Sequence, residues 1–180
     1  MQQHHCMVNR LRIGSGAPVR LMGVINCSPE SFYRGSYIPA GEVYDRALAM
    51  VAAGADMIDL GARSTAPGSP PIPVAEEAAR VDAALSELDG TGITLSVDTR
   101  YPEVLEVCLR HDVHAFNDIS GLTDERYARA VADSGLPVFA MASCRVPGDA
   151  VGVAATRKAL EAVVGRCAHY GIEEYVLDPA

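Results

Sequence analysis

Polar side chains that could bind a flat heterocycle or a metal ion follow short apolar runs at five places in the chain. Each run ends on an asparagine or an aspartate, in the segments Met22–Asn26, Met57–Asp59, Leu95–Asp98, Ala115–Asp118 and Tyr175–Asp178. Carboxylates accept hydrogen bonds, and side-chain amides both donate and accept them. A buried parallel strand is typically a continuous apolar run, so polar residues at the strand ends meet at one rim of the sheet. The pattern predicts a polar cup.

The composition excludes several classes of protein. The chain has 180 residues, of which 49% are hydrophobic and 21% charged, so it can form one soluble domain with a substantial core. Its formal net charge of -8 disfavours a nucleic-acid partner, which requires a basic surface. We find neither a membrane-spanning apolar segment nor a signal peptide, and expect a cytoplasmic protein without a membrane partner.

Cysteine and arginine positions give weaker indications. The five cysteines are odd in number and lack C-x-x-C spacing, which argues against disulfides and zinc. His4, His5 and Cys6 could bind a metal ion adventitiously, but near the chain end we expect them to be disordered. Four arginines, Arg34, Arg63, Arg100 and Arg145, follow the strand ends. They could attract an anionic small ligand, although each alone is equally consistent with a solvated loop residue.

The apolar runs alternate with segments of helical periodicity, which predicts an α/β fold with a parallel sheet. Strands are expected at about 20–26, 56–60, 93–98, 114–118, 137–142 and 174–178. Helices are expected at about 41–53, 75–89, 102–110, 124–133 and 153–170, and glycines 54, 90, 135 and 171 follow four of them. A doubly wound sheet lacks support because no glycine-rich turn follows the first strand. We predict an incomplete (β/α)8 TIM barrel over 21–180, with 1–20 as an N-terminal extension.

Two of the loops that connect the predicted strands and helices are long for a compact α/β domain. They cover 27–39 and 61–73 and are rich in proline and glycine. Loops of this length in compact α/β proteins often serve as lids or binding loops, although a surface excursion without function is the alternative.

Six sequence motifs, which occur in the same order along the chain as in the family, resemble those of dihydropteroate synthase. They are Gly23–Phe32, Gly54–Gly61, Ser64–Gly68, Ser96–Thr99, Asn117–Ile119 and Leu177–Pro179. The resemblance implies a barrel enzyme that joins 6-hydroxymethyl-7,8-dihydropterin diphosphate to an aminobenzene, usually p-aminobenzoate, and releases pyrophosphate. Catalysis would consist mainly of leaving-group stabilisation and exclusion of water.

The resemblance also implies residue roles. Asp98, Asn117 and Asp178 are similar in position to the family's pterin contacts, and a carboxylate can accept two adjacent N–H bonds from a pterin edge. Asn26 resembles the residue that approaches the Mg2+ held by the diphosphate, so Asn26 and Asp98 are the predicted catalytic residues and Mg2+ the predicted cofactor. The alternatives are that Asp98 caps a helix and that Asn117 and Asp118 form a turn.

The two loops would close over this site. The predicted lid residues are Ser28, Pro29, Glu30, Ser31, Phe32, Pro67 and Gly68. Further predicted substrate contacts are Arg63, Ser64, Thr65 and Met141. Ala66 stands where the family has an arginine, and the segment after Met141 lacks the family's M-H-M-Q-G pattern. These differences predict an altered acceptor, such as the ribosylated aminobenzene of the methanopterin pathway.

The family's last two βα units, which bring a lysine, an arginine and a histidine to the site, are not present in the 180 residues. We therefore expect a fragment of a longer polypeptide, or a chain completed by another chain or by a homodimer. A pterin-dependent methyltransferase and a non-catalytic pterin-binding module are the alternative functions.

Overall fold

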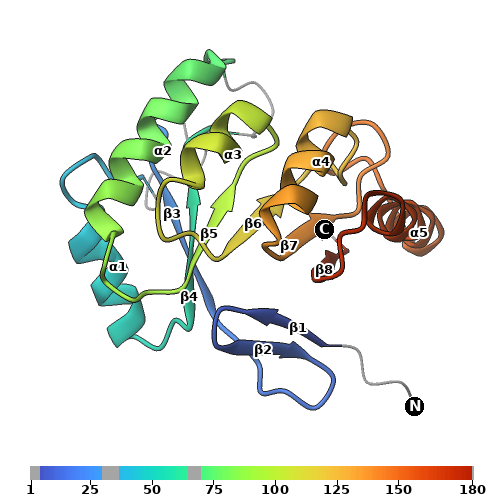
Figure 1. Cartoon of the computed structure of the whole chain (residues 1–180), viewed down its shortest axis with the longest axis horizontal. Helices are drawn as coiled ribbons and strands as arrows, with labels where there is room; N and C mark the ends of the chain where they lie inside the picture. The colour runs from blue at the N-terminus through green and yellow to red at the C-terminus, as the bar shows by residue number, and fades with distance from the viewer. Residues whose placement is uncertain (1–4, 30–36, 65–69, 180) are drawn as a thin grey trace.

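The described residues of the computed structural model, 5–29, 37–64 and 70–179, form a curved parallel sheet with helices along one face (Figure 1). The strands are β3 (Met22–Asn26), β4 (Met57–Gly61), β5 (Leu95–Asp98), β6 (Ala115–Asp118), β7 (Val138–Met141) and β8 (Tyr175–Asp178). The helices are α1 (Val43–Ala52), α2 (Val74–Leu88), α3 (Pro102–Cys108), α4 (Glu125–Ser134) and α5 (Val153–Tyr170). The six strands and five helices predicted from the apolar periodicity are confirmed.

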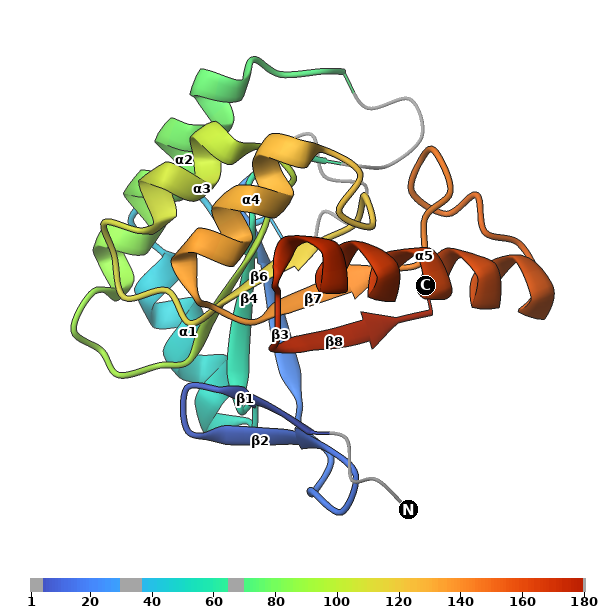
Figure 2. The same ribbon diagram turned by 45° about the vertical axis from the view of Figure 1, so that its right-hand side comes forward.

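The order of the strands in the sheet is the order of the chain, β3-β4-β5-β6-β7-β8. A doubly wound sheet reverses its strand order at a switch point, whereas a barrel adds each new strand to the same edge. Figure 2 shows the helices following this order around the outside of the curved sheet. The topology is therefore that of a (β/α)8 barrel, of which these residues form six strands.

The two faces of the sheet differ in chemistry. Ile58 and Leu60 of β4, Val97 of β5 and Phe116 of β6 point outward and are fully buried against the helices. Asp59 and Gly61 alternate with them along β4 and therefore face the inside of the barrel. Burial of the outward face supplies most of the stabilisation, which leaves the inward strand ends available for polar groups.

A hairpin closes the N-terminal end of the inward face. It consists of β1 (His5–Val8) and β2 (Leu11–Gly14), and its side chains Cys6 and Val8 pack against Met57 and Ala115. The expectation of disorder is wrong for His5 and Cys6. The hairpin is missed by sequence analysis because its strands have only four residues and its turn is Asn-Arg, with Asn9 at φ 53°, rather than Asn-Gly. The domain boundary near residue 20 stays a prediction.

The sheet has two edge strands within the described residues. At the edge of β3, Tyr37 forms a bridge with Asn26, and the N–H of Ile38 donates to the carbonyl of Asn26 at 2.9 Å. On β8, Leu177 and Asp178 are exposed. In the part of the chain that the structure describes, no helix has the length and apolar character to cross a membrane.

Candidate active site

Four residues lie side by side at the carboxyl ends of β3 to β6. Asn26 pairs with Gly61, Gly61 with Asp98, and Asp98 with Asn117. Residues in register on parallel strands point to the same face, so this rim row faces the inside of the barrel. The structure thus brings together three of the residues predicted to bind the pterin or its metal ion, Asn26, Asp98 and Asn117.

Gly61 lies in the middle of the rim row, where an added side chain would press on its neighbours. A Cβ atom at this position would lie 3.1 Å from Oδ1 of Asn26 and 3.7 Å from Oδ2 of Asp98. The absence of a side chain therefore leaves this space to the polar groups of Asn26 and Asp98.

Asp59 precedes Gly61 by two residues on the same face of β4 and is 4% exposed. Its Oδ2 accepts a hydrogen bond of 2.9 Å from Nδ2 of Asn117. Burial raises the pKa of Asp59, and the hydrogen bonds from Asn117 and Ser96 oppose this effect. Sequence analysis places Asp59 at a strand end but not in the site. The alternation of residues 57, 59 and 61 along a buried strand is the signal that would have included it.

Asp98 carries the strongest electrostatic perturbation of the site. Burial, followed by the negative charges of Asp59, Glu77 and Asp118, holds the pKa of Asp98 well above its ordinary value. A raised pKa means that the carboxyl group is more easily protonated. A ligand that brings N–H donors or positive charge would stabilise its ionised form. The alternative role of Asp98 as a helix cap is not supported, because Tyr101 is the N-cap of α3 and no side chain caps this end.

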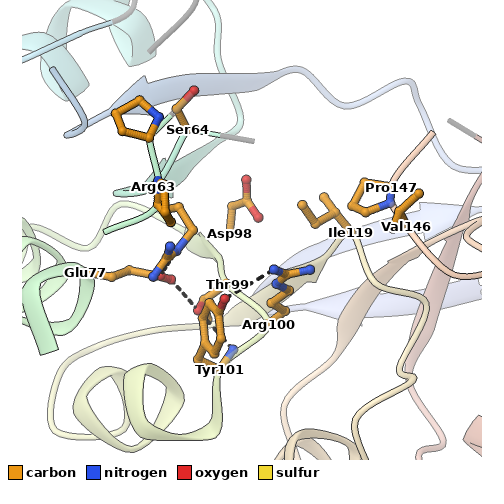
Figure 3. A pocket seen from close by; sticks show the side chains of 12 residues that line it. Arg63, Ser64, Glu77, Asp98, Thr99, Arg100, Tyr101, Ile119, Val146 and Pro147 are labelled. Atoms are coloured by element: carbon orange, nitrogen blue, oxygen red, sulfur yellow. Dashed lines mark hydrogen bonds and ion pairs between the residues drawn. The ribbon is translucent and has the colours of Figure 1, made fainter. Parts of the chain in front are cut away.

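A pocket of about 300 Å³ extends from Asp98 toward the loops (Figure 3). It is lined by Arg63, Ser64, Pro70, Pro71, Glu77, Asp98, Thr99, Arg100, Tyr101, Ile119, Val146 and Pro147. Asp98 lies between the Arg63 side and the Ile119 side of this pocket in the close view. The predicted substrate contacts Arg63 and Ser64 therefore border the same space as Asp98.

Arg63 is held in place by α2. Its Nε donates to Oε2 of Glu77, its Nη2 donates to the carbonyl of Ile72 at 2.7 Å, and its guanidinium carbon lies 4.8 Å from the centre of the Tyr101 ring. Glu77 is 1% exposed and also accepts a 2.7 Å bond from Thr99 Oγ1. Two of the Arg63 nitrogens are thus committed to protein partners.

Glu77 was not predicted to belong to the site. Its position in the sequence did carry a signal, since Glu77, Val81 and Leu85 recur every four residues and share the buried face of α2. A carboxylate on the apolar face of a helix requires a buried partner, and Arg63 is that partner.

Asp118 organises the loop after β6 and does not face the rim. Its Oδ1 accepts bonds from the backbone N–H of Ser120 at 2.9 Å and from its Oγ at 2.6 Å, and Oδ2 accepts from the N–H of Leu122. These bonds hold Leu122 at a positive φ of 59°. Asn117 and Asp118 both belong to β6, so the alternative that they form a turn is wrong, and the Asp118 side chain instead holds the turn that follows the strand.

Asp178 lies on the inward face of β8, two residues beyond Val176, which continues the register of Asn117 through Phe139. It pairs with Met141, and its backbone carbonyl accepts a 2.8 Å bond from the N–H of Ala142. Asp178 and Met141 therefore share the carboxyl-end rim with the other predicted residues.

The remaining predicted residues lie in the two loops. Ser28 is buried and Pro29 is exposed. The predicted residues Glu30, Ser31, Phe32, Thr65, Pro67 and Gly68, together with Arg34, lie outside the described residues. Their roles stay predictions.

The strand order and the polar rim at the carboxyl ends define an α/β-barrel protein with a ligand site at its C-terminal face. Residues 22–180 match the family model described as pterin binding enzyme, and the chain belongs to this family.

Curated relatives agree with this assignment. The chain is 38% identical over 135 residues to a probable bifunctional folylpolyglutamate synthase/dihydropteroate synthase of Haloferax volcanii, which covers 72% of the chain and 16% of the relative. It is 36% identical over 122 residues to dihydropteroate synthase of Mycobacterium leprae, which covers 67% of the chain and 43% of the relative. The chain thus spans less than half the length of either relative.

Solved structures confirm the barrel fold. Xanthomonas albilineans dihydropteroate synthase with 4-aminobenzoic acid superposes with a TM-score of 0.82 at 29% identity, covering 99% of this chain and 67% of that one. The Thermus thermophilus enzyme in complex with 4-aminobenzoate gives 0.72 at 34% identity, covering 98% and 66%. These residues therefore form about two thirds of a TIM barrel of the dihydropteroate synthase type.

Proposed function

We propose that this chain belongs to a dihydropteroate synthase of folate biosynthesis, which joins 6-hydroxymethyl-7,8-dihydropterin diphosphate to an aminobenzene. The observation that carries this proposal is the rim row, where Asn26, Asp98 and Asn117 surround a side-chain-free position at Gly61. The names of the relatives and of the solved structures support it.

In the proposed reaction the pterin ring binds inside the barrel against Asp98 and Asn117, with Asp178 as a further acceptor. The bond between the pterin methylene carbon and the diphosphate oxygen breaks, and its electron pair leaves with pyrophosphate. The nitrogen lone pair of the aminobenzene then forms the new C–N bond, and the amine loses a proton. Positive charge that develops on the pterin favours the ionised form of Asp98, whose ionisation is suppressed by burial in the free chain.

The donor set fits a Mg2+ ion that arrives with the diphosphate. Asn26 has a side-chain oxygen at the rim, close to Gly61. No group of three or more His, Cys, Asp or Glu side chains suited to a metal occurs in the described residues. Mg2+ commonly takes one or two protein ligands beside phosphate and water, and it would neutralise negative charge on the leaving group. Asn26 is the residue proposed to hold it.

The acceptor is proposed to bind in the pocket beside Asp98. Arg63 borders this pocket but is paired with Glu77, so its charge is largely neutralised. This arrangement favours an acceptor that does not depend on a free arginine at this position. We therefore propose p-aminobenzoate or a ribosylated aminobenzene as the two acceptors to compare.

The test supplies the pterin diphosphate, Mg2+ and each aminobenzene in turn, and measures pyrophosphate and the pterin–aminobenzene product. The proposal expects both products, in equal amounts, only when all components are present. Pterin binding without pyrophosphate would support the non-catalytic module instead, and methyl transfer from a methylated pterin to a corrinoid would support the methyltransferase. The predicted homodimer or complementing chain is tested by light scattering on the same sample.

A further inference from the structure

Asp59 is a buried carboxylate beneath the rim row, and the proposed reaction leaves it unused. One oxygen, Oδ2, accepts the 2.9 Å bond from Asn117, whereas Oδ1 is buried without a hydrogen bond of normal geometry among the described residues, although the Ser96 hydroxyl lies close enough to lower the pKa of Asp59. A buried carboxylate with an unsatisfied oxygen costs stability unless another benefit offsets it. This cost points to a role in the site.

The geometry gives Asp59 control over the amide of Asn117. The Asp59 oxygen that meets Asn117 is the acceptor of this bond, whereas a side-chain amide has an NH2 donor on one side and an oxygen acceptor on the other. With the Asn117 nitrogen directed at Asp59, its oxygen is directed away from Asp59. Reversing the amide would place two acceptor oxygens against each other in a buried position.

We propose that Asp59 is a positioning residue that fixes the amide of Asn117 so that its oxygen is presented to the ligand. The ligand must then carry an N–H donor where it meets Asn117, which selects one edge pattern of a nitrogen heterocycle. This inference rests on the proposed pterin-binding function for the identity of the ligand. The orientation of the amide itself does not depend on it.

The substitution Asp59→Asn tests the proposal with little change in volume. The new amide can donate or accept, so Asn117 is no longer held in one orientation. We expect the Kd for 6-hydroxymethyl-7,8-dihydropterin, measured by calorimetry, to rise about 10-fold. We expect the Tm to be unchanged or higher, because a buried charge is removed.

Asp56→Asn is the matched control. Asp56 precedes the same strand at the opposite end of the barrel, where it accepts bonds from the N–H of Leu21 at 2.8 Å and from Arg20 at 2.9 Å. The same chemical change there should lower the Tm and leave the Kd within about 2-fold of the unsubstituted chain.

A double-mutant cycle separates positioning from direct contact. In the background Asn117→Ala, the change Asp59→Asn should alter the Kd by less than about 2-fold, because the amide it positions is gone. An equal 10-fold loss in both backgrounds would overturn the proposal in favour of direct contact with the ligand. A lower Tm with an unchanged Kd would overturn it in favour of a purely structural role.

An NMR measurement on the free chain does not need a ligand. The side-chain NH2 of Asn117 should be protected from solvent exchange in the unsubstituted chain and in Asp56→Asn, and should lose protection in Asp59→Asn. Equal exchange in all three would overturn the inference. If the chain fails to bind the pterin at all, the proposed function fails, and this measurement still decides the role of Asp59.

Discussion

The site residues on the central strands differ from those on the edge strands. Asp59, Asp98 and Asn117 lie on β4 to β6, each of which has a strand on both sides, and Asp59 and Asn117 are joined by a hydrogen bond. Asn26 and Asp178 lie on β3 and β8, which have one strand neighbour within the described residues, and Asp178 is exposed. The same position at a strand end is therefore flanked by two hydrogen-bonded strands in the centre of the sheet and by one at the edge.

The largest expected effect is on the reaction rate, and it differs between the central and the edge strands. Asp98→Asn should lower the rate of pyrophosphate release by about 1,000-fold, because a desolvated carboxylate is lost from a fixed position. Asp178→Asn should lower it by only about 10-fold, since an exposed group on an edge strand has a weaker effect. Steady-state kinetics of both variants measure the difference. Equal losses would show that the contrast between centre and edge does not govern function.

A second prediction concerns Glu77, which supports the site on the central strands. Glu77→Ala should lower the free energy of unfolding by about 3 kcal/mol, because it leaves Arg63 and Thr99 without their buried partner. Urea denaturation measures this value. Glu76→Ala is the control on the same helix, where the carboxylate of the ion pair with Arg80 is 46% exposed, and it should cost no more than about 0.5 kcal/mol. Similar losses in both variants would contradict the role given to Glu77.

Two glycines on neighbouring strands separate ligand binding from packing. A Cβ at Gly61 would meet Asn26 and Asp98, whereas a Cβ at Gly23 would lie 2.9 Å from Ile58 and Met50 on the outward face. Gly61→Ala should weaken pterin binding by about 10-fold with little loss of stability. Gly23→Ala should lower stability by about 2 kcal/mol and leave the Kd unchanged. The reverse pattern, measured by calorimetry and urea denaturation, would exclude the assigned faces of the sheet.

The smallest expected effect is on the pH dependence of stability, and it comes from His111, outside the central and edge strands. His111 contacts Asp89 at 2.7 Å and Asp82 at 3.0 Å. Burial lowers the pKa of His111, but the bonds to Asp82 and Asp89 outweigh it, and the net pKa is raised above its ordinary 6.5. The resulting stabilisation is complete below pH 6.5 and is lost as the pH rises through the raised pKa.

The partners of His111 are largely exposed, so this contribution should be less than about 1 kcal/mol. His111→Phe should remove this part of the pH dependence of urea denaturation and leave pyrophosphate release at its original rate. An unchanged pH profile of stability would rule out the ion pairs as its source.

The sequence predicts the barrel elements well because their signals are local. Apolar runs mark the six strands, and glycines such as Gly135 and Gly171 end helices with φ of 67° and 76°. Parallel strands in chain order then place Asn26, Asp98 and Asn117 at one rim. Their convergence follows from topology alone.

What sequence reasoning missed depends on tertiary contacts. The pairing of Arg63 with Glu77 joins a loop to a helix face, and the bond between Asp59 and Asn117 joins strands separated by 58 positions. The burial of Cys6 likewise requires the hairpin to pack against the strand starts of the barrel. Such contacts leave only indirect marks, such as a carboxylate where periodicity calls for an apolar residue.

A crystal structure of the chain with 7,8-dihydropteroate tests the central claim most directly. The account predicts that the pterin ring lies over Gly61, with hydrogen bonds to Asp98 and to the side-chain oxygen of Asn117. A pterin ring bound away from the rim row, or one that meets the nitrogen rather than the oxygen of Asn117, would contradict it.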